Sequence, residues 1–305
     1  MKVDEMRAVR VEFEGRWYGG VVGEDGFRLM LTPELEPVDV IASEGWSGFR
    51  ASAIRPVSLS QGRLLSPIAR PGKILCVGLN YRDHIEEQGL EVPRSPILFS
   101  KVSTSVIGPG DPIPLHLITD QVDYEVELAI VIGRRVRGIS RRQALDVVAG
   151  YTVMNDVSAR DLQFGDQQWM RGKSLDGFAP MGPAIVSPDE VGDLGNLEVR
   201  AEVNGELRQA SNTRQMVFGA AELIEFCAEA MTLEPGDVIA TGTPGGVGVF
   251  MDPPTFLQAG DTVTVAVERI GELTNPVDAA PAQDEEARVF GGRAKGATGS
   301  AGGQR

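Results

Sequence analysis

Three acidic residues in two apolar segments have the types and spacing that indicate chemistry most directly. Glu125 and Glu127 alternate at the start of segment 126–132, which is typical of a buried strand, so the two-residue period places both carboxylates on one face. Asp156 ends a second predicted strand, residues 151–156. Buried carboxylates repel one another unless a cation lies between them. The pattern therefore predicts a hard divalent cation with these three residues as ligands.

The alternative for the two glutamates is a strand edge exposed to solvent, where water would screen both charges. The run Leu128–Ile132 is apolar at every position, as in a strand covered on both faces, and this favours the metal site. Ligation by carboxylates without His or Cys selects Mg²⁺, Mn²⁺ or Ca²⁺ rather than zinc or copper. Three protein ligands would leave positions for water and substrate, as in a catalytic site.

His84 is the second candidate. It lies in a polar segment just after the predicted strand 73–78, and a helix there would place Glu87 on the same face at i+3. Glu87 would then orient the imidazole and raise its basicity, which is the arrangement of a general base. The alternative is a surface histidine on a solvated turn. The other histidine, His116, follows a proline-containing turn and is expected to be structural.

Lys173 is the third candidate, in the loop-like stretch 171–182. A lysine in such a stretch is usually a surface residue. Near a metal and an anionic substrate, it would instead bind a carboxylate or stabilise a developing oxyanion. Arg160, Asp161 and Gln163 follow the third acidic residue closely and are expected to line the same pocket.

The glycine-rich stretch Thr241–Gly248 is the fourth candidate. It lacks the Gly-Lys-Ser/Thr of a P-loop and the spacing of a dinucleotide fingerprint, which excludes both interpretations. We expect a turn that approaches a small ligand closely. Its N–H groups and the Thr243 hydroxyl would hold a substrate carboxylate.

The elements that must position these residues are mainly strands. Residues 1–70 carry short alternating segments broken by turns, which predict a small β-rich module. A larger domain then begins with the strand 73–78. The spacing predicts helices over Ser140–Ala149 and Met216–Met231, and Asn204-Gly205 predicts a β-hairpin.

Composition limits the partners. The 305 residues carry a formal net charge of -14, so we expect no nucleic-acid partner and no anionic membrane surface. No apolar run approaches the roughly 20 residues of a membrane span, and the two cysteines fit reduced thiols, which together predict a soluble cytoplasmic protein. Residues 278–305 are rich in Ala and Gly and are expected to be a disordered tail.

Six motifs occur in one order and together resemble the fumarylacetoacetate hydrolase family over residues 71–277. They are Asn80-Tyr81-x-x-His84-x-x-Glu87, Glu125-x-Glu127, Asn155-Asp156-Val-Ser-Ala-Arg-Asp161, Arg171-Gly-Lys-Ser174, Pro180-Met-Gly-Pro183 and Gly242-Thr-Pro-x-Gly-Val-Gly248. The resemblance implies an α+β, mainly β fold, a mixed β-sandwich or β-roll with a small N-terminal β-rich module. It also implies a homodimer.

The resemblance further implies roles for matching positions. Mg²⁺ or Mn²⁺ would be bound by the three acidic residues. The pair matching His84 and Glu87 lies in a lid and activates a water in the hydrolases. Lys173 and Thr243 would contact the substrate, and we assign Tyr81, Arg160 and Gln163 to the same substrate-binding set.

The favoured function is a metal-dependent hydrolase that cleaves a carbon-carbon bond in an acylpyruvate-type 2-oxo acid, with a pyruvate enolate as leaving group. The alternative keeps the site but changes the reaction. It would be a decarboxylase or isomerase of oxaloacetate-like or 2-hydroxymuconate-type (hydroxyhepta-diene-dioate) acids from aromatic catabolism. A third hypothesis is a non-catalytic, metal-stabilised β protein that binds a small acid or a partner.

Overall fold

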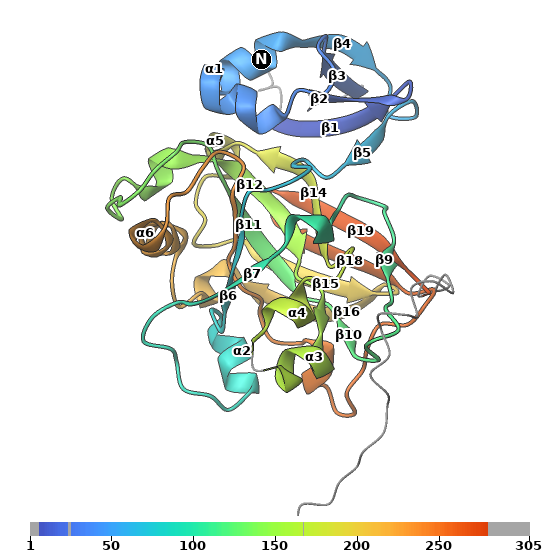
Figure 1. Ribbon diagram of the computed structural model, residues 1–305, viewed down its shortest axis with the longest axis vertical. Helices are drawn as coiled ribbons and strands as arrows, with labels where there is room; N and C mark the ends of the chain where they lie inside the picture. Colours follow the sequence, from blue (N-terminus) through green and yellow to red (C-terminus); the bar gives the residue numbers. More distant parts are fainter. Residues whose placement is uncertain (1–5, 24–25, 167, 280–305) are drawn as a thin grey trace, which may run out of the picture.

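The computed structural model of the protein describes residues 6–23, 26–166 and 168–279. In Figure 1 the chain up to β4 forms the upper end of the molecule, and the remaining elements form a larger body below it. The disordered tail predicted for 278–305 lies outside the described residues from residue 280 on. The boundary predicted near residue 70 stays a prediction, because the two parts share one sheet.

Twelve strands of the described chain form this sheet, in the order β4-β3-β2-β1-β14-β12-β11-β17-β6-β7, with β5 paired to β1 and β8 to β14. The bounds are β1 Arg7–Phe13, β2 Arg16–Gly23, β3 Gly26–Met30, β4 Ala53–Val57, β5 Arg63–Leu65, β6 Ile74–Gly78, β7 Ile97–Lys101, β8 Val106–Ile107, β11 Val126–Ile132, β12 Val148–Asn155, β14 Ala179–Val186 and β17 Val238–Ala240. The segments predicted to carry acidic ligands, β11 and β12, therefore lie side by side within the sheet rather than at an edge.

Two smaller sheets complete the β structure of the described residues. One has the order β16-β15-β18-β19-β9, and the other pairs β10 with β13. The bounds are β9 Ile113–Pro114, β10 Val122–Asp123, β13 Ser158–Ala159, β15 Glu198–Val203, β16 Glu206–Asn212, β18 Thr262–Val267 and β19 Gly271–Asp278. The hairpin predicted at Asn204-Gly205 is confirmed, because it joins β15 to β16.

Helices are few and short in the described chain, so the predicted mainly β, α+β fold is confirmed. They are α1 Pro37–Ser52, α2 Arg82–Glu87, α3 Arg160–Gly165, α4 Met170–Lys173, α5 Pro188–Val191, α6 Ala220–Ala230 and the 3₁₀ turns η1 Ser103–Ser105, η2 Ala144–Val147, η3 Thr213–Gln215 and η4 Gly248–Phe250. The prediction over Met216–Met231 is realised as the shorter α6. The first helix, α1, was not predicted; it buries Val38, Ile41 and Phe49.

The helix predicted over Ser140–Ala149 is wrong. The described structure has only the 3₁₀ turn η2 there, and β12 already begins at Val148. Val148 pairs with Ile132, and Gly150 with Val131, on the neighbouring strand. Of the apolar residues that suggested a helical face, Ala144 and Val147 are buried from the 3₁₀ turn, and the last two already belong to β12. Tertiary contacts thus override a weak local preference.

The strand β11 supplies side chains to two core clusters. Val126, Leu128 and Ile130 belong to the cluster shared with the five-stranded sheet, whereas Ala129 and Val131 belong to the cluster shared with α1. Both faces of the strand are therefore covered, as its continuous apolar run predicts. The two free cysteines are buried, one in each cluster.

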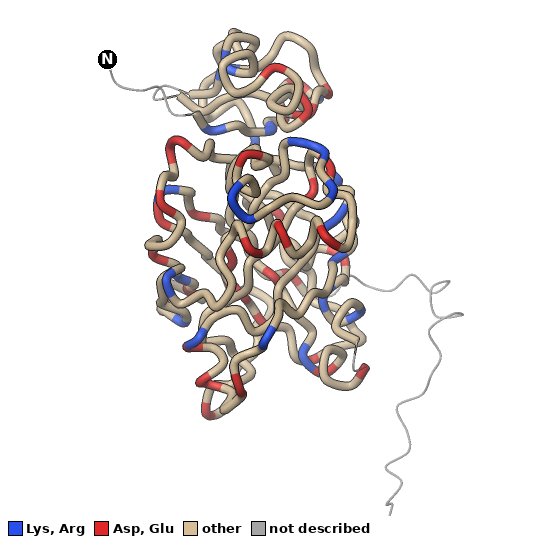
Figure 2. Tube along the Cα trace, turned by 90° about the vertical axis from the view of Figure 1, so that its left-hand side faces the viewer, with Lys and Arg blue, Asp and Glu red and all other residues tan. Residues whose placement is uncertain are grey.

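Charged residues of both signs are distributed over the trace in Figure 2. Segment 134–142 carries five arginines, a local cluster of basic residues that the negative net charge of the chain did not predict. Arg141 of this segment pairs with Glu222 and Glu225 of α6, at 2.9 and 3.2 Å, so acidic neighbours offset part of its charge. Across the described residues, every helix is too short or too polar to cross a membrane.

Candidate active site

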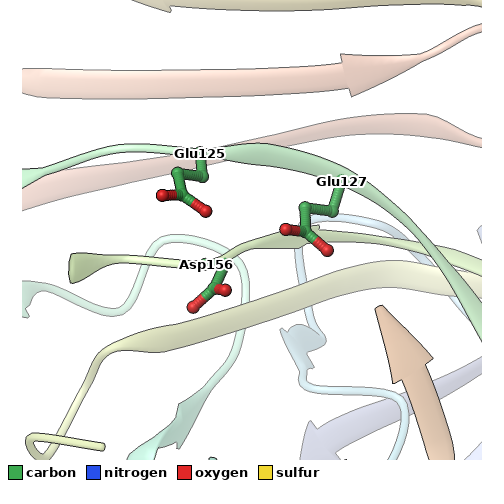
Figure 3. Close-up of side chains that lie close together, drawn as sticks. All are labelled: Glu125, Glu127 and Asp156. Carbon is green, nitrogen blue, oxygen red and sulfur yellow. The ribbon is translucent and has the colours of Figure 1, made fainter. Parts of the chain in front are cut away.

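The three acidic residues converge. Glu127 lies in β11 and Glu125 directly precedes this strand, while Asp156 directly follows β12. The antiparallel register pairs Val126 with Asn155 and so brings the acidic ends of the two strands together. One carboxylate oxygen from each residue lies within 4.8 Å of the others, and all three side chains are buried (Figure 3). The solvent-exposed strand edge is therefore excluded.

Buried basic side chains surround two of these carboxylates. Lys173 Nζ donates to Glu125 Oε2 at 2.8 Å and to Asp156 Oδ2 at 3.0 Å. Lys101 Nζ, from the end of β7, lies 2.6 Å from Asp156 Oδ1, and Arg160 Nη1 lies 2.6 Å from Glu125 Oε1. Lys173 is 1% exposed, so the alternative of a surface lysine is wrong.

Glu127 differs from the other two carboxylates. It accepts a hydrogen bond of 2.8 Å from the N–H of Gly242, and the described residues include no basic side chain in an ion pair with it. Burial, together with the negative charges of Asp156 and Glu125, raises its pKa well above the ordinary value of a glutamate. Burial also acts on Glu125, but there Lys173 and the neighbouring guanidinium lower the pKa to about 2.

The types and charges of these residues show whether they fit a metal. Three buried carboxylate oxygens within 4.8 Å of one another match the oxygen-only ligand set of a hard cation such as Mg²⁺ or Mn²⁺. Among the described acidic and basic groups in contact here, four carboxylates meet three cations: Asp123, Glu125, Glu127 and Asp156 against Lys101, Arg160 and Lys173. The residues fit a divalent cation, which would compensate the charge on Glu127.

The segment around His84 is helical, as the i, i+3 spacing requires. In α2, His84 Nδ1 lies 2.9 Å from Glu87 Oε2, and the carboxylate can only accept, so the Nδ1–H donates. Nε2 is then the acceptor nitrogen, and the Gln88 amide donates to it at 2.9 Å. Glu87 Oε1 accepts from the N–H of Gly246 at 2.9 Å. The imidazole is therefore oriented with its basic nitrogen away from the carboxylate.

A cavity of about 120 Å³ connects these groups. Its polar wall is formed by His84, Gln88, Glu125, Glu127, Arg160, Gln163, Lys173 and Thr243, and its apolar wall includes Leu90, Phe99, Phe164, Trp169 and Phe250. Asp161, which was expected to line the cavity, is not part of its wall and accepts from the Thr119 hydroxyl instead. The catalytic and substrate-binding candidates meet at this cavity, with two exceptions. Glu87 contacts the Nδ1 of His84 and does not line the cavity. Tyr81 is fully buried and is not part of the wall either, and its hydroxyl has no hydrogen-bond partner among the described residues.

The remaining substrate-binding candidates are held by neighbours. Gln163 Oε1 accepts from Arg160 Nη1 at 3.0 Å, and Thr243 Oγ1 accepts from the Gln209 amide at 2.8 Å. Arg160 lines the cavity, and its Nη2 is buried without a hydrogen-bond partner among the described residues. His116 lies away from the cavity, where its ring packs against Phe178, in agreement with a structural role.

Three residues of the site were missed from sequence. Lys101 ends the apolar strand Ile97–Lys101, and a lysine there was a signal for a buried charge. Asp123 precedes the acidic pair by two positions and could have been read with it. Gln209, whose amide bridges the N–H of Val126 and Thr243, lies in an ordinary polar strand and left no signal.

Comparison with known proteins agrees with this fold. Residues 73–278 match the family model described as fumarylacetoacetate (FAA) hydrolase C-terminal. The chain belongs to the fumarylacetoacetate hydrolase family of enzymes. One relative, the mitochondrial oxaloacetate tautomerase of Xenopus laevis, is 49% identical over 223 residues, which cover 72% of this chain and 70% of that protein.

Solved structures extend the match to the N-terminal part. Fumarylacetoacetate hydrolase from psychrophilic Exiguobacterium antarcticum is 41% identical, with a TM-score of 0.77 over 90% of this chain and 99% of that chain. The 5-carboxymethyl-2-hydroxymuconate delta-isomerase from Mycobacterium smegmatis is 38% identical, with a TM-score of 0.74 over 90% of this chain and all of that chain (100%). The similar proteins are therefore named for three reactions: tautomerisation, hydrolysis and isomerisation.

Proposed function

We propose that the protein is a divalent-metal-dependent tautomerase of an oxaloacetate-like 2-oxo acid, which interconverts the enol and keto forms. The observation that carries this proposal is the cavity lined by the oriented imidazole of His84 and by Glu125 and Glu127, two members of the buried acidic triad. The name of the Xenopus relative supports the reaction, and it favours the isomerase alternative over the acylpyruvate hydrolase.

Glu125, Glu127 and Asp156 would hold the cation. When bound, Mg²⁺ or Mn²⁺ would supply Lewis-acid polarisation of the 2-oxo group. Its two positive charges would also change the balance of the site from four carboxylates against three cations to a net positive charge, which attracts an anionic substrate.

His84 would move the proton. In the keto-to-enol direction, Nε2 would accept a proton from C3, and the imidazolium would then return a proton, through solvent, to the oxygen on C2, so that His84 is restored and the two forms have the same composition. Glu87 keeps the Nδ1–H in place and stabilises the imidazolium that forms. The Gln88 amide, which now donates to Nε2, must move aside for this step. No water is consumed, in contrast to hydrolysis.

Other cavity residues would bind the substrate. The guanidinium of Arg160, which lines the cavity and has one nitrogen without a partner among the described residues, would bind a substrate carboxylate. Lys173 lies between Glu125 and Asp156, where it would stabilise negative charge on a substrate oxygen. The Thr243 hydroxyl accepts from Gln209, so its own proton can be donated to the ligand.

One panel of assays tests the proposal. Purified protein with Mg²⁺ or Mn²⁺ is given enol oxaloacetate, keto oxaloacetate, acetylpyruvate and a 2-hydroxymuconate-type acid. We expect faster loss of the enol absorbance of oxaloacetate, abolished by Glu127→Ala or by EDTA. Release of pyruvate from oxaloacetate would instead indicate a decarboxylase, and acetate from acetylpyruvate a hydrolase.

The isomerisation of a 2-hydroxymuconate-type acid is the second candidate, supported by the similar structure from Mycobacterium smegmatis. It uses the same proton transfer on a longer enol, so the fourth substrate of the panel decides. If His84→Ala left every reaction unchanged, the assigned base would be wrong.

Assembly and location remain predictions. The homodimer is tested by sedimentation velocity, where a species of twice the 32.7 kDa chain mass is expected and a monomer would contradict it. The cytoplasmic location has no support from the Xenopus relative, whose name places that protein in mitochondria.

A further inference from the structure

Asp123 is a fully buried carboxylate next to the site that has no role in the proposed reaction. It lies at the end of β10, two residues before Glu125. Oδ1 accepts from the N–H groups of Tyr124 at 2.9 Å and Gly248 at 2.8 Å. Oδ2 accepts from Arg160 Nε at 2.8 Å and from the N–H of Val249 at 3.0 Å. Four donors occupy the acceptor sites of an ionised carboxylate, so this group has none left for a metal or substrate.

The contact with Arg160 fixes the guanidinium. Nε is held by Asp123, and Nη1 by Glu125 at 2.6 Å and Gln163 at 3.0 Å. Nη2 is the nitrogen that remains without a partner among the described residues. A guanidinium is planar, so fixing two of its nitrogens determines where the third one points.

The same carboxylate holds the turn η4. Gly248 and Val249 donate to it, and the space is tight: a Cβ on Gly248 would lie 2.0 Å from the carbonyl oxygen of Thr255 and 2.8 Å from Asp123 Oδ1. Phe250 of this turn contacts the ring of His84, with 6.0 Å between ring centroids. The Asp123 side chain therefore connects the cavity-lining Arg160 to the turn that packs against His84.

We infer that Asp123 is a positioning residue, which holds Arg160 in the cavity wall so that its guanidinium receives the carboxylate of the substrate. The inference rests on the proposed function only in assigning an anionic ligand to Arg160. It adds a residue that acts through another and touches neither metal nor substrate.

The test is binding of oxalate in the presence of Mg²⁺, measured by calorimetry. Oxalate presents two adjacent oxygens as a 2-oxo acid does, but cannot enolise, so binding is separated from turnover. In Asp123→Asn an amide NH₂ replaces one acceptor oxygen and faces two N–H donors. We expect the oxalate Kd to rise about 10- to 100-fold, with KM for oxaloacetate affected more than kcat.

A double-mutant cycle distinguishes positioning from general destabilisation. If Asp123 acts through the arginine, Asp123→Asn combined with Arg160→Gln should bind oxalate no more weakly than Arg160→Gln alone. Additive losses would overturn the inference. An unchanged oxalate Kd in Asp123→Asn would do the same.

Asp237→Asn is the matched control. Asp237 is another buried carboxylate, which accepts from the N–H of Glu234 at 2.7 Å and pairs with Lys73 at 2.7 Å, away from the cavity wall. This variant should lower the Tm without changing the oxalate Kd. If Asp237→Asn raised the oxalate Kd as much as Asp123→Asn does, the loss of any buried carboxylate would weaken binding, and the inference would be wrong.

Chemical rescue covers the case in which Asp123→Asn does not fold. In Arg160→Ala, methylguanidinium should restore oxalate affinity with saturation, because a planar cation can reach Asp123 and Glu125 together, whereas methylammonium should not. Equal rescue by both cations, or none, would contradict the inference. Failure of oxaloacetate turnover in the wild type would count against the proposed reaction alone, whereas a wild type that bound no oxalate would overturn the role of Asp123.

Discussion

At the scale of single residues, Glu127 determines how the site responds to pH. Burial and the charges of Asp156 and Glu125 raise its pKa, so the folded state favours its protonated form. A raised acid pKa stabilises the fold below the ordinary glutamate pKa, and this stabilisation is lost as pH rises through the raised value. We therefore expect the Tm of the metal-free protein to fall as pH rises, and added Mg²⁺ to remove that loss.

Thermal unfolding in EDTA and in Mg²⁺ across a pH series measures this effect. Glu127→Gln is the control, since an amide does not titrate, and its metal-free Tm should depend less on pH. A Mg²⁺-induced rise in Tm that was the same at every pH would count against the assignment of Glu127 as a ligand.

Lys101 is a second residue with a measurable contribution. Its buried Nζ lies 2.6 Å from Asp156 Oδ1 and donates to the carbonyl of Val157 at 3.0 Å. Removing one partner of a buried ion pair leaves the other uncompensated, at about 3–5 kcal/mol. We expect Lys101→Met to lower the free energy of unfolding in EDTA by about this amount, and Mg²⁺ to restore part of it.

Urea titration of Lys101→Met, with and without Mg²⁺, checks this prediction. Lys73→Met is a matched control, because Lys73 also pairs with a buried carboxylate, Asp237, but away from the acidic triad. It should lose stability without recovery in Mg²⁺. Recovery in both variants would mean that Mg²⁺ acts elsewhere.

At the scale of elements, α2 and the glycine-rich segment after β17 depend on each other. Glu87 accepts from the N–H of Gly246, and Gly246 has a φ of +99° that favours glycine. A Cβ there would lie 2.2 Å from the carbonyl oxygen of Arg208. We expect Gly246→Ala to displace this segment, disturb the orientation of His84 and reduce turnover by about 10-fold or more.

Gly260→Ala separates this effect from backbone strain. Gly260 has a similar φ of +93°, but a Cβ there would meet nothing within 4 Å. Both variants should lose about 1–2 kcal/mol of stability in denaturant titrations because both place alanine at positive φ. Gly246→Ala should lose more, because its Cβ also meets the carbonyl oxygen of Arg208. Turnover in Gly260→Ala should stay close to that of the wild type, and equal losses in both would sink the proposed coupling.

At the scale of the whole molecule, the N-terminal part is integrated with the body. The strand β1 pairs with β14 through Arg7 and Val186, and the Trp46 indole donates to the carbonyl of Ala149 at 2.7 Å. Side chains from α1 share a core cluster with β11 and β12. We expect a chain lacking residues 1–70 to aggregate or to melt well below the full chain, because its removal exposes this apolar face.

Expression and circular dichroism of the shortened chain test this expectation. Deletion of residues 280–305 is the comparison, since their composition predicts a disordered tail and an unchanged Tm. A stable, soluble chain from residue 71 onwards would instead establish the first 70 residues as an independent module.

The sequence by itself determined the features that depend on local spacing. The apolar run after Glu125 predicts a strand covered on both faces, the two-residue period places Glu125 and Glu127 together, and Asn204-Gly205 predicts a hairpin. The order of six motifs also indicated the family, which the match over 73–278 confirms. Each of these signals lies within one segment or in the order of segments.

Only the tertiary structure decided which distant groups meet. Pairing with β11 made a strand of the residues from Val148 on, where spacing predicted the end of a helix. The tertiary structure also buried Lys101 and Lys173 against the acidic residues and surrounded Asp123 with four hydrogen-bond donors. The physical reason is that the cost of a buried charge depends on its partners, and these come from segments far apart in the chain.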